Sequence, residues 1–196
     1  MRAISSFIAV FSSGALTSLY LVLPVIRVNL GYTAEPEAYV VRNSALLSSI
    51  PSGIMLVLMW TFDSSLASLL GRRLRRGVRV KLIEVMNELV LAYLPTLILL
   101  LFLIPYTWLN LPNLTAEDLG EYLYLVKGLE ESGIYSSGIL AILFSSLASS
   151  AIYPLVFRYR LGFRWNHAAV LSFVVLLSNT LILLWVLSVS GWNELA

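Results

Sequence analysis

The chain has 196 residues, of which 59% are hydrophobic and only 12% are charged, and its formal net charge is +2. A mean hydropathy of +0.85 and repeated apolar runs of about twenty residues exclude an ordinary soluble domain and predict a multi-pass integral membrane protein. The absence of cysteine excludes disulfides, thiolate nucleophiles and thiolate metal sites.

The apolar segments predict an all-α membrane fold, a bundle of five transmembrane helices that forms one membrane domain over residues 1–196. The predicted spans cover about residues 4–28, 44–70, 89–108, 137–157 and 168–189. Between the first two spans, the segment 29–43 is expected to be an irregular hydrated loop because it contains glycine, proline and acidic residues. Small residues in two spans predict close helix packing: Ser12, Ser13, Gly14 and Ser18 in the first, and Ser145, Ser146, Ser149 and Ser150 in the fourth.

Two further segments have the periodicity of short amphipathic helices. One is the stretch 80–89, which leads into the third span. The other follows Thr115, Glu117 and Asp118, which together are typical of a helix start. Its apolar face would consist of Leu119, Tyr122, Leu123, Val126 and Leu129. We expect both helices to lie at the membrane surface.

Basic residues gather in two connections between spans. We call the stretch 71–81 the first basic segment; it contains Arg72, Arg73, Arg75, Arg76, Arg79 and Lys81. The second basic segment, 158–164, contains Arg158, Arg160 and Arg164. If both lie in the cytoplasm together with Arg2, ten basic residues are inside and three are outside, namely Arg27, Arg42 and Lys127. The positive-inside rule then predicts an inner N-terminus and an outer C-terminus.

The basic segments have several possible roles. They can act only as a topology signal, bind anionic lipid headgroups, or dock an acidic partner protein. Nucleic acid is not expected as a partner, because the first basic segment lacks the aromatic residues that would stack on bases.

Asp63 is an ionisable residue inside the second predicted span, where a charge is costly and usually faces a partner, a cavity or an ion path. It could belong to a proton or cation relay. Alternatively, it could be a packing residue that pairs with Arg160, Arg164 or His167, or that reaches the interface. In the fifth span, the most polar residues are Asn179 and Thr180, which we expect to hydrogen-bond to another helix.

No constellation of residues predicts an enzyme. His167 is the only histidine, so the chain cannot form a metal site from several histidines. Glu84 and Glu88 lie one helical turn apart and are expected to pair with nearby cations rather than to act as an acid and a base. We therefore predict no catalytic residue, cofactor or metal. Asn113 begins the sequon Asn-Leu-Thr and would be open to glycosylation on the predicted outer face.

The layout and a few local runs resemble the Yip family, the Ypt-interacting membrane proteins with five spans. The first likeness is Leu70-Gly71, the basic connection and then Tyr93-Leu94-Pro95. The second is Leu161-Gly162-Phe163 followed by His167-Ala168-Ala169. The resemblance implies a five-helix scaffold that organises other membrane components. In the eukaryotic family members, this fold is associated with binding lipidated small GTPases and with membrane shaping. Those proteins carry a long cytoplasmic N-terminal region, whereas here the first predicted span begins at Ile4.

The sequence thus predicts a non-catalytic membrane scaffold, or an accessory subunit of a larger assembly in the cell membrane. Its partners would be other membrane protein subunits and anionic lipid headgroups. The alternative is a small transporter or channel that uses Asp63 and Asn179, with Pro51 and Pro95 shaping its path.

Overall fold

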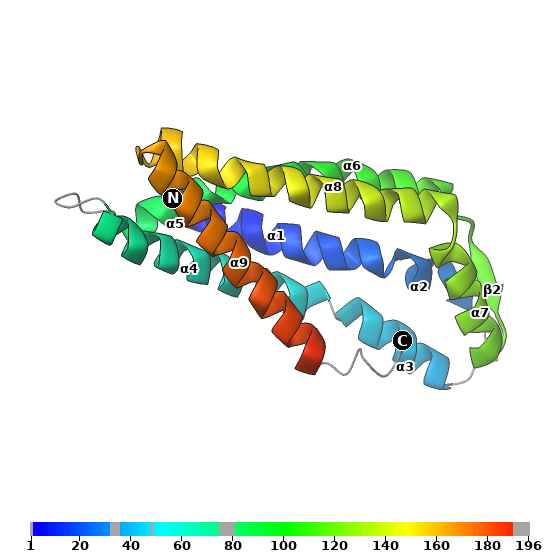
Figure 1. The fold of residues 1–196 in the computed structure, drawn as a ribbon. Helices are drawn as coiled ribbons and strands as arrows, with labels where there is room; N and C mark the ends of the chain where they lie inside the picture. The colour runs from blue at the N-terminus through cyan, green and yellow to red at the C-terminus, as the bar shows by residue number, and fades with distance from the viewer. Residues whose placement is uncertain (1, 32–35, 48, 75–80, 190–196) are drawn as a thin grey trace. The chain divides into compact units, whose positions relative to one another are not determined.

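The computed structural model describes residues 2–31, 36–47, 49–74 and 81–189, and these are mostly helical (Figure 1). The α-helices are α1 (Arg2–Leu21), α2 (Leu23–Arg27), α3 (Pro36–Leu47), α4 (Ser49–Leu74), α5 (Leu82–Leu89), α6 (Leu94–Asn110), α7 (Leu119–Glu130), α8 (Gly133–Leu155) and α9 (Trp165–Val189). A 3₁₀ turn, η1 (Val90–Ala92), follows α5, and a π-helical turn, η2 (Val156–Arg160), follows α8. The strands are β1 (Val28–Leu30) and β2 (Leu114–Ala116).

Several helices have the length and composition of membrane spans. Within the described residues, three stretches qualify, namely Ile4–Leu21, Pro36–Leu74 and Gly133–Arg160. The count becomes four if Leu82–Ala92 and Leu94–Asn110 form one broken span. The prediction of an α-helical protein with helices long and apolar enough to span a membrane is therefore confirmed. The fifth predicted span coincides with α9, which is not among these candidates, so five spans stay a prediction.

The connection between the first two spans differs from the expected irregular loop. That prediction was wrong, because β1 occupies its beginning and α3 begins within it, at Pro36. Proline is favourable at the first helical position, where its missing N–H would have no partner, and Glu37 in the first turn complements the helix dipole. Pro95 likewise lies in the first turn of α6 and not inside a continuous third span.

The chain divides into two compact units. Unit 1 comprises residues 1–6, 58–92 and 150–196, and unit 2 comprises residues 7–57 and 93–149. The division falls within α1, α4 and α8, so each unit contains part of these helices.

In unit 2, small residues bring helices close together. A Cβ atom added at Gly14 of α1 would lie 2.8 Å from the Ser52 carbonyl oxygen and 3.0 Å from the Gly53 Cα atom of α4. The backbones of α1 and α4 therefore approach as closely as glycine permits, as the small residues of the first span predicted. The fourth span behaves similarly, because the Thr96 hydroxyl of α6 lies 3.1 Å from that of Ser145 and 3.4 Å from that of Ser149.

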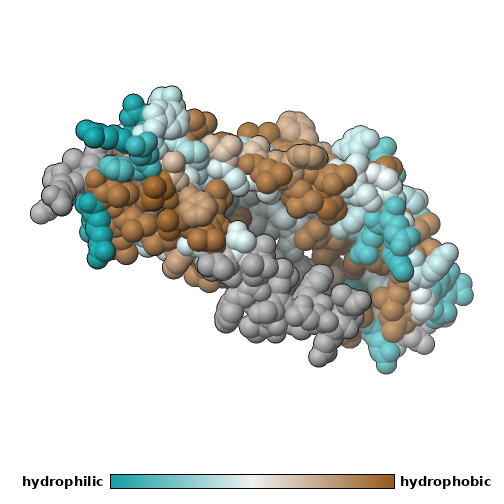
Figure 2. Space-filling model, in the orientation of Figure 1, coloured by the Kyte–Doolittle hydropathy of each residue, from teal (hydrophilic) through white to brown (hydrophobic). Residues whose placement is uncertain are grey.

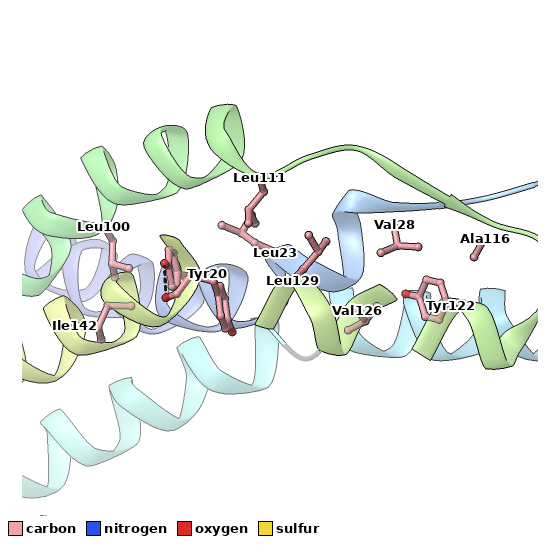
Figure 3. Packing of buried hydrophobic residues seen from close by; sticks show 11 residues of the cluster. Tyr20, Leu23, Val28, Leu100, Leu111, Ala116, Tyr122, Val126, Leu129 and Ile142 are labelled. Carbon is pink, nitrogen blue, oxygen red and sulfur yellow. Dashed lines mark hydrogen bonds between the residues drawn. The ribbon is translucent and has the colours of Figure 1, made fainter. Parts of the chain in front are cut away.

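The core of unit 2 is organised around two tyrosines (Figure 3). The rings of Tyr20 and Tyr135 stack with their centroids 5.4 Å apart. The Tyr20 hydroxyl donates to the Tyr135 carbonyl at 3.2 Å and accepts from the Thr107 hydroxyl at 3.3 Å. The Tyr135 hydroxyl in turn donates to the Leu21 carbonyl at 2.9 Å. Each buried hydroxyl is thus satisfied, as burial of a polar group requires.

Helix α7 packs on the two strands, which pair in parallel with Val28 opposite Leu114. The predicted amphipathic helix is confirmed, but its apolar face is not left for the membrane surface. Tyr122, Val126 and Leu129 are buried in the core of unit 2, and the Tyr122 hydroxyl donates to the Val25 carbonyl at 3.1 Å. Burial raises the pKa of Tyr122, which keeps this donor neutral. Protein contacts therefore hold α7 in place.

In unit 1, the end of α8 turns sharply into α9. Pro154 removes a backbone donor from the last turn of α8, and η2 follows directly. Gly162 then adopts a φ of 70°, a left-handed conformation that glycine tolerates best. The predicted lead-in helix forms as α5, whose Val85 and Leu89 are buried. It is tied to α4 by the Trp60 indole, which donates to the Met86 carbonyl at 3.1 Å.

Candidate functional site: a buried polar pair and a basic surface

Asp63 lies in the middle of α4 and is fully buried, with 0% of its surface exposed. Its neighbour Ser64 is also fully buried and satisfies its hydroxyl within the helix, by donating to the Trp60 carbonyl at 2.7 Å. The Asp63 carboxyl group does not bond within its own helix in this way, because its hydrogen bonds go to side chains of α9 and α8. The residue therefore depends on other helices for its hydrogen bonds.

Two side chains of unit 1 bond to this carboxyl group. The Asn179 amide of α9 donates to Asp63 Oδ2 at 2.9 Å. The side chain of Tyr153, near the end of α8, makes a second hydrogen bond to it. The prediction that Asn179 bonds to another helix is confirmed. The same prediction for Thr180 was wrong, because its hydroxyl donates to the Leu176 carbonyl of its own helix at 2.9 Å.

The pair has two buried oxygens without a hydrogen-bond partner among the residues that the structure describes. One is Asp63 Oδ1 and the other is Asn179 Oδ1. Both atoms are acceptors, so neither can satisfy the other while Asp63 is ionised. Unpaired buried polar atoms are rare and indicate a bound proton, ion or water, or a functional strain.

One alternative was that Asp63 pairs with Arg160, Arg164 or His167, and this alternative was wrong. Arg160 donates instead to Glu88 Oε2 of α5, at 2.8 Å. In the part of the chain that the structure describes, no ion pair includes Asp63. The carboxyl group is held by neutral donors.

The ion pair between Arg160 and Glu88 joins the second basic segment to the helix that follows the first one. Hydrophilic side chains lie near the end of α4 and near the start of α9 (Figure 2). The exposed basic residues there are Arg72, Arg73, Lys81, Arg160 and Arg164, and we call them the basic surface. Arg75, Arg76 and Arg79 lie outside the described residues.

Arg158 has a different role from its neighbours. It is half-buried and donates to the Phe163 carbonyl at 3.0 Å, which stabilises the turn between η2 and α9. It is therefore less available than Arg160 or Arg164 for a lipid or a partner. His167 is also half-buried, near the start of α9.

The two glutamates of α5 pair with cations, as expected. Glu88 pairs with Arg160, and Glu84 lies 3.9 Å from the Lys81 ammonium. Among the described residues, no group of three or more acidic or histidine side chains could hold a metal ion.

Arg27 was counted only as an outer charge, and its packing role was missed. It is 9% exposed, and its guanidinium donates through Nε, at 3.1 Å, and through a terminal nitrogen to the Leu111 carbonyl that follows α6. Its guanidinium carbon also lies 4.6 Å from the centre of the Trp108 ring. A cation beside a helix C-terminus and over an indole ring is favourable. The signal in the sequence would have been a lone arginine at the end of a span.

Asn113 is exposed just before β2, and Thr115 of the same sequon is exposed within that strand. The sequon is thus physically accessible.

No family model, curated protein or solved structure matches the chain.

Proposed function

We propose that this chain is a multi-pass membrane protein that works by association, as an accessory subunit or a Yip-like scaffold of a larger membrane assembly. Its five spans would place the N-terminus inside and the C-terminus outside, in the cell membrane. The basic surface would then face the cytoplasm, where anionic headgroups and acidic partner segments are available.

The ion pair between Arg160 and Glu88 carries this proposal. It joins Arg160 of the second basic segment to Glu88 of α5, the helix that follows the first basic segment, and the two residues are 72 apart in sequence. The exposed guanidinium groups of Arg73 and Arg164 can each form two parallel bonds to a carboxylate or a phosphate. The ion pair also limits the side-chain freedom of Arg160, so less of that freedom is lost when a partner binds.

Purification in native-lipid discs followed by mass spectrometry tests the proposal. A stoichiometric membrane partner is expected, and recovery should fall when Arg72 and Arg73 are both replaced by glutamine. Lys127→Gln is the matched control, because Lys127 is exposed and pairs only at 4.0 Å with Glu131, on the predicted outer side. A clean monomer in native lipid would contradict the proposal.

The transporter or channel is a second candidate, and the bond between Asn179 and Asp63 favours it, because it unites the two residues that this reading requires. Cysteines introduced beside them, Ser65→Cys and Ser178→Cys, should react with a small aqueous thiol reagent from one or both sides. Asn113→Cys, at an exposed position, controls for labelling. If both test positions stay unreactive while the control reacts, the result contradicts the transporter or channel function.

A further inference from the structure

The unpaired oxygens of Asp63 and Asn179 are complementary to a single proton. A carboxylic acid has one O–H donor, and a side-chain amide has one carbonyl acceptor. When the amide N–H of Asn179 bonds to Oδ2 of Asp63, the two remaining atoms of the planar groups are Oδ1 of each. A proton on Asp63 Oδ1 would satisfy both of them through a second, antiparallel hydrogen bond.

We propose that Asp63 and Asn179 form a proton-binding site inside the membrane domain, in which neutral Asp63 donates from Oδ1 to the Asn179 side-chain oxygen. The site uses the hydrogen bond that the structure already contains, from the Asn179 amide to Oδ2. The Tyr153 hydroxyl donates to the same carboxyl group and completes its surroundings.

Burial and the lack of a counter-charge both support this site. Asp63 is fully buried in a predicted span, where an unpaired carboxylate is costly. In the described part of the chain, its partners are an amide and a phenol, while Arg160 is paired with Glu88. A metal ion would fit less well, because hard cations take several oxygen ligands and the pair offers two unpaired ones.

This inference goes beyond the association function and does not depend on it. It would supply the ionisable group that a transporter needs, but the experiment below detects protonation and not transport. Either proposal can therefore fail alone.

Infrared difference spectroscopy of the intact protein in lipid tests the site. The wild-type spectrum minus that of Asp63→Asn should show the carbonyl band of one protonated carboxyl group, shifted to lower frequency in D₂O. The asparagine variant can form both hydrogen bonds of the pair, so it should fold. Glu117→Gln removes an exposed carboxylate and is the matched control, for which no such band is expected.

A second variant keeps the test decisive if Asp63→Asn fails to fold. In Asn179→Leu the acid loses its acceptor, so the carbonyl band should remain and move to higher frequency. A carboxylate band in place of the acid band would overturn the proposal. Sodium-dependent thermal stabilisation that disappears in Asp63→Asn would overturn it in favour of a metal ion.

Discussion

Arg27 shows how a residue that resembles a topology signal can be a structural element. Replacing it with methionine removes two hydrogen bonds to the Leu111 carbonyl and the contact with Trp108. Because the carbonyl is then left without this donor, we expect a loss of about 2 kcal/mol in the free energy of unfolding. Denaturant titration in detergent micelles would measure it. Arg27→Lys should recover only part of the loss, since an ammonium lacks the fork of donors, and full recovery would contradict this reasoning.

The contacts of single side chains were the hardest feature to predict from the sequence. Hydropathy indicated that Asp63 needs a partner, but the partner is 116 residues away in sequence. An arginine, a histidine and an asparagine were all chemically acceptable, and only packing selects among them. The same limit applies to Arg27, because charge counting cannot distinguish a solvated guanidinium from a buried one.

At the scale of elements, the crossing of α1 and α4 is set by Gly14. Its added Cβ would meet backbone atoms of Ser52 and Gly53, which cannot rotate away. We therefore expect Gly14→Ala to destabilise unit 2 by about 1 to 3 kcal/mol through overpacking. Thermal unfolding in detergent micelles would measure the change, and an unchanged midpoint would show that the two helices can separate at no cost.

Gly128 in α7 is the opposite case and makes a matched comparison. A Cβ atom there would meet nothing within 4 Å. Alanine has the higher helix propensity, so Gly128→Ala should stabilise the protein by up to about 1 kcal/mol in the same unfolding assay. If this variant is destabilised as much as Gly14→Ala, the loss reflects sensitivity to any added methyl group and not the helix crossing.

Helix α7 also depends on its N-terminal cap. The Asp118 carboxylate accepts from the Glu121 N–H at 2.8 Å, and the Glu121 side chain accepts from the Glu117 N–H at 2.8 Å. Asp118→Ala should cost about 1 kcal/mol, whereas Asp118→Asn should retain most of the stability. Helicity and unfolding midpoints of the two variants would be compared. Equal losses would mean that the charge, and not the cap, is what matters.

The helices were easier to predict from the sequence than the residues at which they begin and end. Periodicity located α5 and α7, and composition located the long helices, because burial in lipid or protein demands apolar faces. The paired strands were not foreseen, since each has three residues and the pairing joins Val28 to Leu114. Thr115, Glu117 and Asp118 together indicated the start of α7, but Thr115 extends in β2 and only Asp118 caps the helix. Local propensity allowed either residue, and strand pairing decided between them.

At the scale of the whole molecule, the orientation rests on the excess of ten basic residues over three. The natural lack of cysteine makes single-cysteine labelling in intact cells a direct test. Gly77→Cys, in the first basic segment, should react with a membrane-impermeant reagent only after permeabilisation. Asn113→Cys should react in intact cells, because its position is exposed and on the predicted outer side. Labelling of both from the same side would overturn the predicted orientation.

The same assay decides whether the number of crossings is odd or even. Five spans place the two ends of the chain on opposite sides, whereas an even number places them on the same side. Asn193→Cys, after the fifth predicted span, should therefore react in intact cells, as Asn113→Cys does. If it reacts only after permeabilisation, α9 does not complete a crossing. The pairing of Asp63 with Asn179 would then join α4 to a helix that enters the membrane without leaving it, and the proton site would belong to a re-entrant segment.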